Sequence, residues 1–246
     1  LHPVAHSFPT RRSSDLIKDH YGGKVTAVTM GLPTAGEILK DCLYRGADEA
    51  VLVTDRRCAA SDTLATSYIL SCAVRKLEAD IVLCGRQAID GDTAQVGPQV
   101  AEKLDIPQIT YVENLMALND KTITAKRNLG NGWQEVKTTL PVLLTVVEEA
   151  NEPRAWGARR VMKYKKAKTP FEVASEIKEN TGNGDDKEHG DLVKQKSEEL
   201  SKKGLLIKQW DLDMLEADLD WCGRDGSPTK VHRIQSVVLS AKDTKE

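Results

Sequence analysis

The chain has 246 residues, of which 29% are charged, and its formal net charge is −2. This length supports one main core, or one core with an appended arm. The near-balance of charge gives no global basic field, so nucleic-acid binding is not implied. No apolar run approaches the roughly 18–20 residues that a bilayer crossing needs, so we expect a soluble protein without membrane insertion.

The start of the chain differs from everything that follows. Residues 1–15 have no strand or helix period and lack the long apolar core of a secretory signal. We interpret them as a foreign, misassembled or disordered segment. The globular pattern begins near Leu16 and Ile17.

From residue 22 onward, short apolar runs alternate with amphipathic stretches. Residues 25–30, 50–54 and 80–84 predict strands. Residues 34–45, ending at Gly46, predict a helix; a second helix is capped by Ser61 or Asp62, and a third runs through Leu104. This alternation predicts an α/β fold: a doubly wound, mostly parallel, Rossmann-like sheet with helices on both faces.

The pattern becomes β-rich after Pro107. Residues 109–118, 122–127, 134–139 and 142–147 predict strands, and Gly130, Asn131 and Gly132 form a turn signal between two of them. We expect a β-hairpin insertion that ends in an apolar strand returning to the sheet.

The last hundred residues are polar. A basic run over residues 154–168 is usually a solvated face; binding an acidic partner surface is the alternative. Residues 180–190 predict disorder or a loop, and residues 191–209 a surface helix. Residues 218–240 read as an extended C-terminal arm, with turns at Gly223 and at residues 226–228. This arm has too little apolar surface for its own core, so we expect it to lie against something else.

The most informative segment is a glycine-punctuated loop between the strand at 81–84 and the following helix. Pro98 suits the first helical position, which makes residues 93–96 a non-helical turn with free backbone N–H groups. Such groups suit a phosphate or pyrophosphate, although a plain strand-to-helix connection is the alternative. The loop also carries two carboxylates, Asp90 and Asp92, which would repel a bound anion. They must therefore face backbone amides or ribose hydroxyls, or simply form turns. The candidate binding residues are Gly85, Arg86, Gln87, Asp90, Gly91, Asp92, Thr93, Ala94, Gln95, Val96 and Gly97.

No other chemistry competes with this loop. The sequence has no G-x-x-x-x-G-K-[S/T], G-x-G-x-x-G or G-x-S-x-G motif, and its five histidines lack metal-ligand spacing. The five cysteines form no C-x-x-C pair, which predicts reduced thiols in a cytoplasmic protein. We therefore expect no catalytic residue and no metal site. Ser61, Asp62 and Thr63 read as a helix cap at the same edge of the sheet as the loop.

The loop closely resembles the nucleotide loop of electron transfer flavoprotein β subunits. Further matches are residues 46–48, 61–66, 151–154 and 226–231, so the resemblance spans about residues 17–235. It implies an electron carrier rather than an enzyme, paired with an α subunit that carries a shared FAD. It also implies AMP, or in electron-bifurcating members a second FAD, at Gly85 to Gly97. The Asp-Gly-Asp-Thr-Ala-Gln-Val-Gly-Pro form looks more like the second kind.

The resemblance also divides the chain. Residues 16–150 correspond to the nucleotide-binding domain, without the first strand that the family begins with. Residues 151–246 correspond to a partner-docking segment, a polar insertion and the C-terminal arm, which on the family's pattern wraps the α subunit. Ala158 stands where the docking segment usually carries a leucine, so the partner is a flavin dehydrogenase of the acyl-CoA dehydrogenase type or another kind. The rival interpretations are a stand-alone nucleotide-binding module of universal-stress-protein type, whose G-x-x-G motif is not matched, and a dehydrogenase, which the missing glycine fingerprint disfavours.

Overall fold

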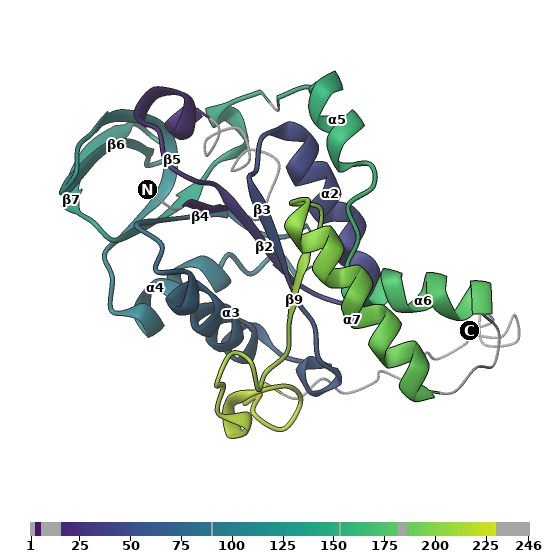
Figure 1. Ribbon diagram of the computed structural model, residues 1–246. Helices are drawn as coiled ribbons and strands as arrows, with labels where there is room; N and C mark the ends of the chain where they lie inside the picture. The colour runs from purple at the N-terminus through teal and green to yellow at the C-terminus, as the bar shows by residue number, and fades with distance from the viewer. Residues whose placement is uncertain (1–2, 6–15, 90, 153, 182–185, 230–246) are drawn as a thin grey trace, which may run out of the picture.

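A single mixed sheet forms the centre of the computed structural model, which describes residues 3–5, 16–89, 91–152, 154–181 and 186–229 (Figure 1). Within these ranges the sheet has the strand order β7-β6-β5-β8-β4-β1-β2-β3-β9. The strands from β5 to β9 in this order are parallel, whereas β6 pairs antiparallel with both β5 and β7. Their bounds are β1 Pro3–Ala5, β2 Thr26–Met30, β3 Glu49–Val53, β4 Ile81–Gly85, β5 Gln108–Leu118, β6 Thr122–Asn128, β7 Trp133–Thr139, β8 Val142–Val146 and β9 Lys208–Trp210.

Helices cover both faces of this sheet, as Figure 1 shows. Side chains alternate between the faces of a strand, so Val28 and Val82 pack with helices α3 and α4, whereas Ala27 and Leu52 pack with α2. The predicted doubly wound α/β fold is therefore confirmed. The helices are α2 Gly36–Arg45, α3 Thr63–Leu77, α4 Val96–Leu104, α5 Ala158–Tyr164, α6 Pro170–Thr181 and α7 Asp186–Lys202, and residues 16–21 are also helical.

The predicted hairpin insertion is present. Leu129 N donates to the carbonyl of Gly132, and Gly130 adopts a φ of +81°, a left-handed conformation that glycine tolerates well. Strand β8 returns to the sheet between β5 and β4, and every residue in it is buried. A fully buried parallel strand explains why its residues are apolar except for Thr145.

One expectation about the sheet needs correction. The sequence predicted a sheet without its first strand, but Pro3–Ala5 forms β1 between β4 and β2, pairing Val4 with Thr26 and with Val82. Two parallel strand edges leave unpaired N–H and C=O groups, and any extended backbone satisfies them whatever its side chains. Residues 6–15 lie outside the described residues.

The polar insertion is more regular than predicted. Helix α7 begins at Asp186, so residues 186–190 are helical rather than a loop, while 182–185 lie outside the described residues. The helix ends at Lys202 instead of continuing to 209, because Gly204 takes a left-handed φ of +65° and terminates it. The chain then forms strand β9 beside β3, with Ile207 fully buried.

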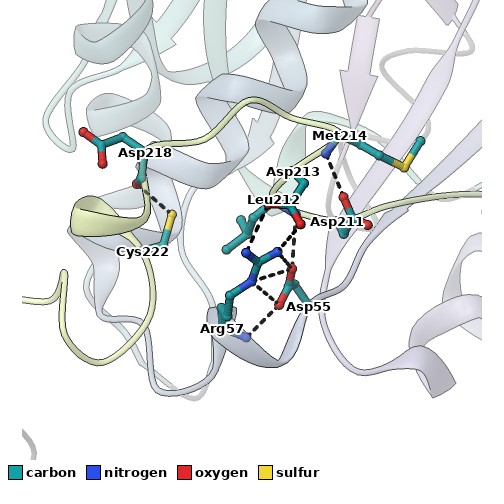
Figure 2. Close-up of polar contacts among 8 residues, drawn as sticks. All are labelled: Asp55, Arg57, Asp211, Leu212, Asp213, Met214, Asp218 and Cys222. Atoms are coloured by element: carbon teal, nitrogen blue, oxygen red, sulfur yellow. Dashed lines mark hydrogen bonds and ion pairs between the residues drawn. The ribbon is translucent and has the colours of Figure 1, made fainter.

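The segment after β9, from residue 211 into the described part of the C-terminal arm, packs on this chain's own domain. Leu212 is fully buried, and Leu215 and Cys222 join the cluster under α3. Figure 2 shows Arg57 between Asp55 and Asp213, donating to both carboxylates at 2.6–3.1 Å. This segment therefore adds buried apolar side chains to the core, a contribution that the sequence analysis did not predict. Residues 230–246 lie outside the described residues.

Candidate functional site

The glycine-punctuated loop lies at the carboxyl edge of the sheet, where open α/β folds bind ligands. It connects β4 to α4 and borders a cavity of about 360 Å³. Of the predicted residues, Gly85, Arg86, Gln87, Thr93, Ala94, Gln95, Val96 and Gly97 line this cavity; Gly91 and Asp92 do not, and Asp90 lies outside the described residues. The sequence did not point to the apolar lining, which comes from Val28, Met30, Leu70, Val74, Val82 and Val100.

The N-terminus of α4 has no side-chain cap. The helix begins at Val96, two residues before the predicted Pro98, and its first backbone bond runs from Gln99 N to the carbonyl of Gln95 at 3.0 Å. Pro98 is tolerated in this first turn because its missing N–H would have had no helical partner. Among the described residues, no acceptor takes a hydrogen bond from the N–H groups of residues 93–97. The predicted open amides are therefore present, with helix α4 adding its N-terminal partial positive charge.

The loop backbone is strained next to these amides. Asp92 has a φ of +48° and Ala94 a φ of +53°, a left-handed conformation that costs a non-glycine residue about 1–2 kcal/mol. Such strain at a cavity is typical of a functional site, because something outside the local sequence must favour it. The Asp92 carboxylate accepts from the side-chain amide of Gln87, so it is engaged within the loop.

Gly97 has a packing role. A methyl group added to it would lie 2.9 Å from Cγ2 of Thr145, 3.5 Å from Cβ of Cys84 and 3.7 Å from Cδ2 of Leu143. The missing side chain lets the start of α4 approach β8 and β4 closely. Gly97 therefore sets the position of the open amides relative to the sheet.

The neighbouring helix α3 provides a contrast at the same edge. Asp62 Oδ1 accepts from the N–H groups of Leu64 and Ala65, at 3.0 Å each, which confirms the predicted cap. Burial opposes ionisation of Asp62, but these N–H groups and that of Thr229 outweigh it and lower its pKa. The protein's own carboxylate thus occupies the N-terminus of α3, whereas that of α4 is open.

The cavity favours negative charge. Among the described residues that line it, Arg86 is the only charged side chain, so no lining carboxylate would repel an anion. Burial raises the pKa of the Cys84 thiol to about 12, which keeps it protonated and unreactive.

The described part of the chain holds no cluster of three or more His, Cys, Asp or Glu side chains able to bind a metal ion, and all five cysteines are free thiols. No described helix is both long and apolar enough to span a bilayer.

The fold and the loop together define a Rossmann-like α/β domain with an open helix N-terminus at its ligand edge. Residues 15–175 match the family model described as "Electron transfer flavoprotein domain". The chain belongs to the electron transfer flavoprotein family. The universal-stress-protein alternative is therefore set aside.

Curated relatives place the similarity within this family. The β subunit of Clostridium acetobutylicum is 38% identical over 218 residues, covering 89% of this chain and 69% of the relative. The β subunit of Thermoanaerobacterium thermosaccharolyticum is 54% identical over 139 residues, covering 56% and 53%. The caffeyl-CoA reductase-Etf complex subunit CarD of Acetobacterium woodii is 46% identical over 149 residues, covering 60% and 56%.

These relatives confirm the resemblance to β subunits, which are electron transfer subunits rather than catalytic enzymes. Apart from the clostridial match, the chain spans about half the length of the relatives just described.

Proposed function

We propose that this chain is the β half of an electron transfer flavoprotein: it pairs with an α subunit, and the two share an FAD that carries electrons from a flavin dehydrogenase. The loop from Gly85 to Gly97 binds the phosphate of an adenine nucleotide, either AMP or a second FAD. We further propose a cytoplasmic location, in keeping with five free thiols.

The observation that carries the nucleotide proposal is the run of open N–H groups from Thr93 to Gly97. These neighbouring N–H groups lie at a cavity and at the N-terminus of α4, whose partial positive charge favours an anionic acceptor. A phosphate has the required charge and several acceptor oxygens, and Arg86 adds a cation, with no carboxylate among the described residues of the lining. Beside them, the apolar lining that includes Met30 and Leu70 suits a flat ring system.

The choice between AMP and a second FAD rests on the loop's form. The sequence from Asp90 to Pro98 resembles that of bifurcating members, so we favour a second FAD. A flavin supplies one- and two-electron redox chemistry when bound. This chain's contribution is to hold the phosphates on α4 and to enclose the ring in an apolar environment.

The docking face is proposed from α5 and the turn before it. Trp156 and Met162 are 58% and 63% exposed, unusually high for large apolar residues. Arg160 Nε donates to the carbonyl of Leu43 at 2.7 Å and Nη2 to that of Ala47, which fixes α5 against the end of α2. We propose that this face meets the flavin dehydrogenase.

The proposed division is residues 1–15 outside the family pattern, 16–150 for the nucleotide and 151–246 for partner contacts.

Co-expression with the α subunit of the same source tests the proposal. We expect a stable αβ pair with a flavin spectrum, in which released FAD and AMP are counted per pair. Two FAD would support the bifurcating form, and one FAD with one AMP would support simple electron transfer. A chain that stays monomeric and nucleotide-free with its α subunit present would refute the proposed function.

A further inference from the structure

Gln95, the residue immediately before α4, makes an unusual side-chain contact. At such a position a side-chain oxygen ordinarily accepts from the second or third N–H of the helix. Gln95 makes no such bond; its Oε1 instead accepts from the hydroxyl of Thr63 at 2.9 Å. The side chain is thereby held toward α3, and the N–H groups of α4 stay open.

This arrangement leaves Gln95 with donors to spare. Because Oε1 is the acceptor for Thr63, the Nε2 group supplies two N–H donors, and no acceptor among the described residues takes them. Gln95 lines the cavity between the open amides and α3. Its side-chain donors are therefore available at the same place as the backbone donors.

Thr63 is itself fixed by the C-terminal arm. The preceding residue, Asp62, accepts from Thr229 N at 3.0 Å through Oδ2, and Asp62 N donates to the hydroxyl of Ser227 at 2.9 Å. Ser227 is 2% exposed and donates to the carbonyl of Gly223 at 2.6 Å. We call the contacts of Asp62 with Ser227 and Thr229 the clasp.

The Thr63–Gln95 bond is not needed to hold the two helices together. Helices α3 and α4 already pack through buried apolar side chains, among them Ile69, Ala73, Val100 and Ala101. The bond itself is exposed, and exposed hydrogen bonds add little to stability because water replaces them. A role in orienting Gln95 explains it better than a role in folding.

We propose that Thr63 is a positioning residue of the anion site: it turns Gln95 away from the helix N-terminus and presents its side-chain N–H donors to the phosphate, while the clasp fixes Thr63. This proposal rests on the proposed function of the loop as a phosphate site. Because coupling is reciprocal, a bound phosphate also tightens the clasp.

Titration of the full chain with ADP tests the proposal, since ADP forms the adenine-nucleotide half of FAD and contains AMP. Thr63→Val keeps the shape and removes the hydroxyl, so we expect roughly 3- to 10-fold weaker binding, the equivalent of one hydrogen bond. Thr63→Ser restores the donor and should bind within about twofold of the wild type. Thr122→Val is the matched control, because Thr122 Oγ1 also donates to an amide oxygen, that of Asn119 at 3.2 Å, but in the hairpin.

Unfolding in urea and amide hydrogen exchange distinguish positioning from mere stability. Saturating ADP should slow exchange at Thr229 in the wild type and much less so in Thr63→Val. A Thr63→Val protein that is less stable but binds ADP as tightly as the wild type would overturn the proposal.

A second variant covers the case in which Thr63→Val does not fold. Gln95→Leu changes an exposed position and should lose at least as much ADP affinity as Thr63→Val does. Adding Thr63→Val to Gln95→Leu should weaken ADP binding no further. Equal ADP affinity in Gln95→Leu and the wild type would contradict the role given to Gln95. If the wild type binds no ADP at all, the proposed nucleotide function fails, and this inference falls with it.

Discussion

The close contact at Gly97 leads to a quantitative prediction for Gly97→Ala. Gly97 is the second residue of α4 and has a φ that alanine readily adopts, so the backbone conformation adds no cost. The new methyl group would lie 2.9 Å from Cγ2 of Thr145. Thr145 cannot easily turn away, because it is 2% exposed and its hydroxyl accepts from Tyr111 N at 3.1 Å. Overpacking of this kind costs about 1–3 kcal/mol, and better helix propensity returns less than about 1 kcal/mol.

We therefore expect Gly97→Ala to lower the free energy of unfolding by about 1–2 kcal/mol, measured from urea unfolding midpoints. Thr145→Ser removes the clashing Cγ2 atom and keeps the hydroxyl. Adding Gly97→Ala to Thr145→Ser should then lower the free energy of unfolding little further. This corresponds to a coupling free energy of about 1 kcal/mol or more between the two positions. Gly91→Ala is the control, because, its chain neighbours aside, no atom of the described residues lies within 4 Å of the added methyl group.

Strict additivity of Gly97→Ala and Thr145→Ser would refute this reasoning. So would a Gly91→Ala variant as unstable as Gly97→Ala. Either result would mean that glycine is required here by the backbone or by a ligand, and that the approach of α4 to β8 is not what demands it.

Three further predictions concern the arm and the docking face. Gly223→Ala should cost more than about 2 kcal/mol and speed proteolysis of the arm, because Gly223 has a φ of +61° and the new methyl would lie 2.0 Å from the carbonyl oxygen of Arg57. The Arg57 guanidinium lowers the pKa of Asp55 to about 2. The stabilising contribution of the Asp55 carboxylate is therefore complete above about pH 4 and is lost as the pH falls toward 2. Urea unfolding at about pH 5 and pH 3 should show about 1 kcal/mol from this group after solvent screening, and Asp55→Asn should remove that pH dependence. Arg160→Met should lower the thermal midpoint by roughly 2–8 °C through two lost hydrogen bonds, whereas Arg159→Met, at an exposed position, should not.

The local patterns in the sequence predicted most of the sheet and helices. Strand β8 was recognisable because all its residues but Thr145 are apolar, and α3 because Asp62 is a strong cap followed by helical spacing. The open amides at α4 were also predictable. The lack of a Ser, Thr, Asp or Asn directly before the helix leaves its first N–H groups without a side-chain partner, and Pro98 marks that first turn because its missing N–H is not needed there.

Short-range patterns did not reveal contacts between distant segments. Strand β9 has only three residues and is a strand because β3 offers it an edge, not because of its own alternation. The bond from Thr229 to Asp62 joins residues 167 positions apart, and neither local pattern predicts the other as its partner. The packing role of Gly97 could not be predicted, because a sequence does not show which side chain will lie opposite a glycine.

The position of β9 in the chain has a consequence for biosynthesis. The ribosome makes β3 early and β9 last among the described strands, so a nascent chain exposes the free edge of β3 through most of its synthesis. Such an edge invites pairing with another chain. A protease that cut between α7 and β9 would recreate this exposed edge in the finished protein, and the apolar side chains of Trp210 and Leu212 would leave the core together with it.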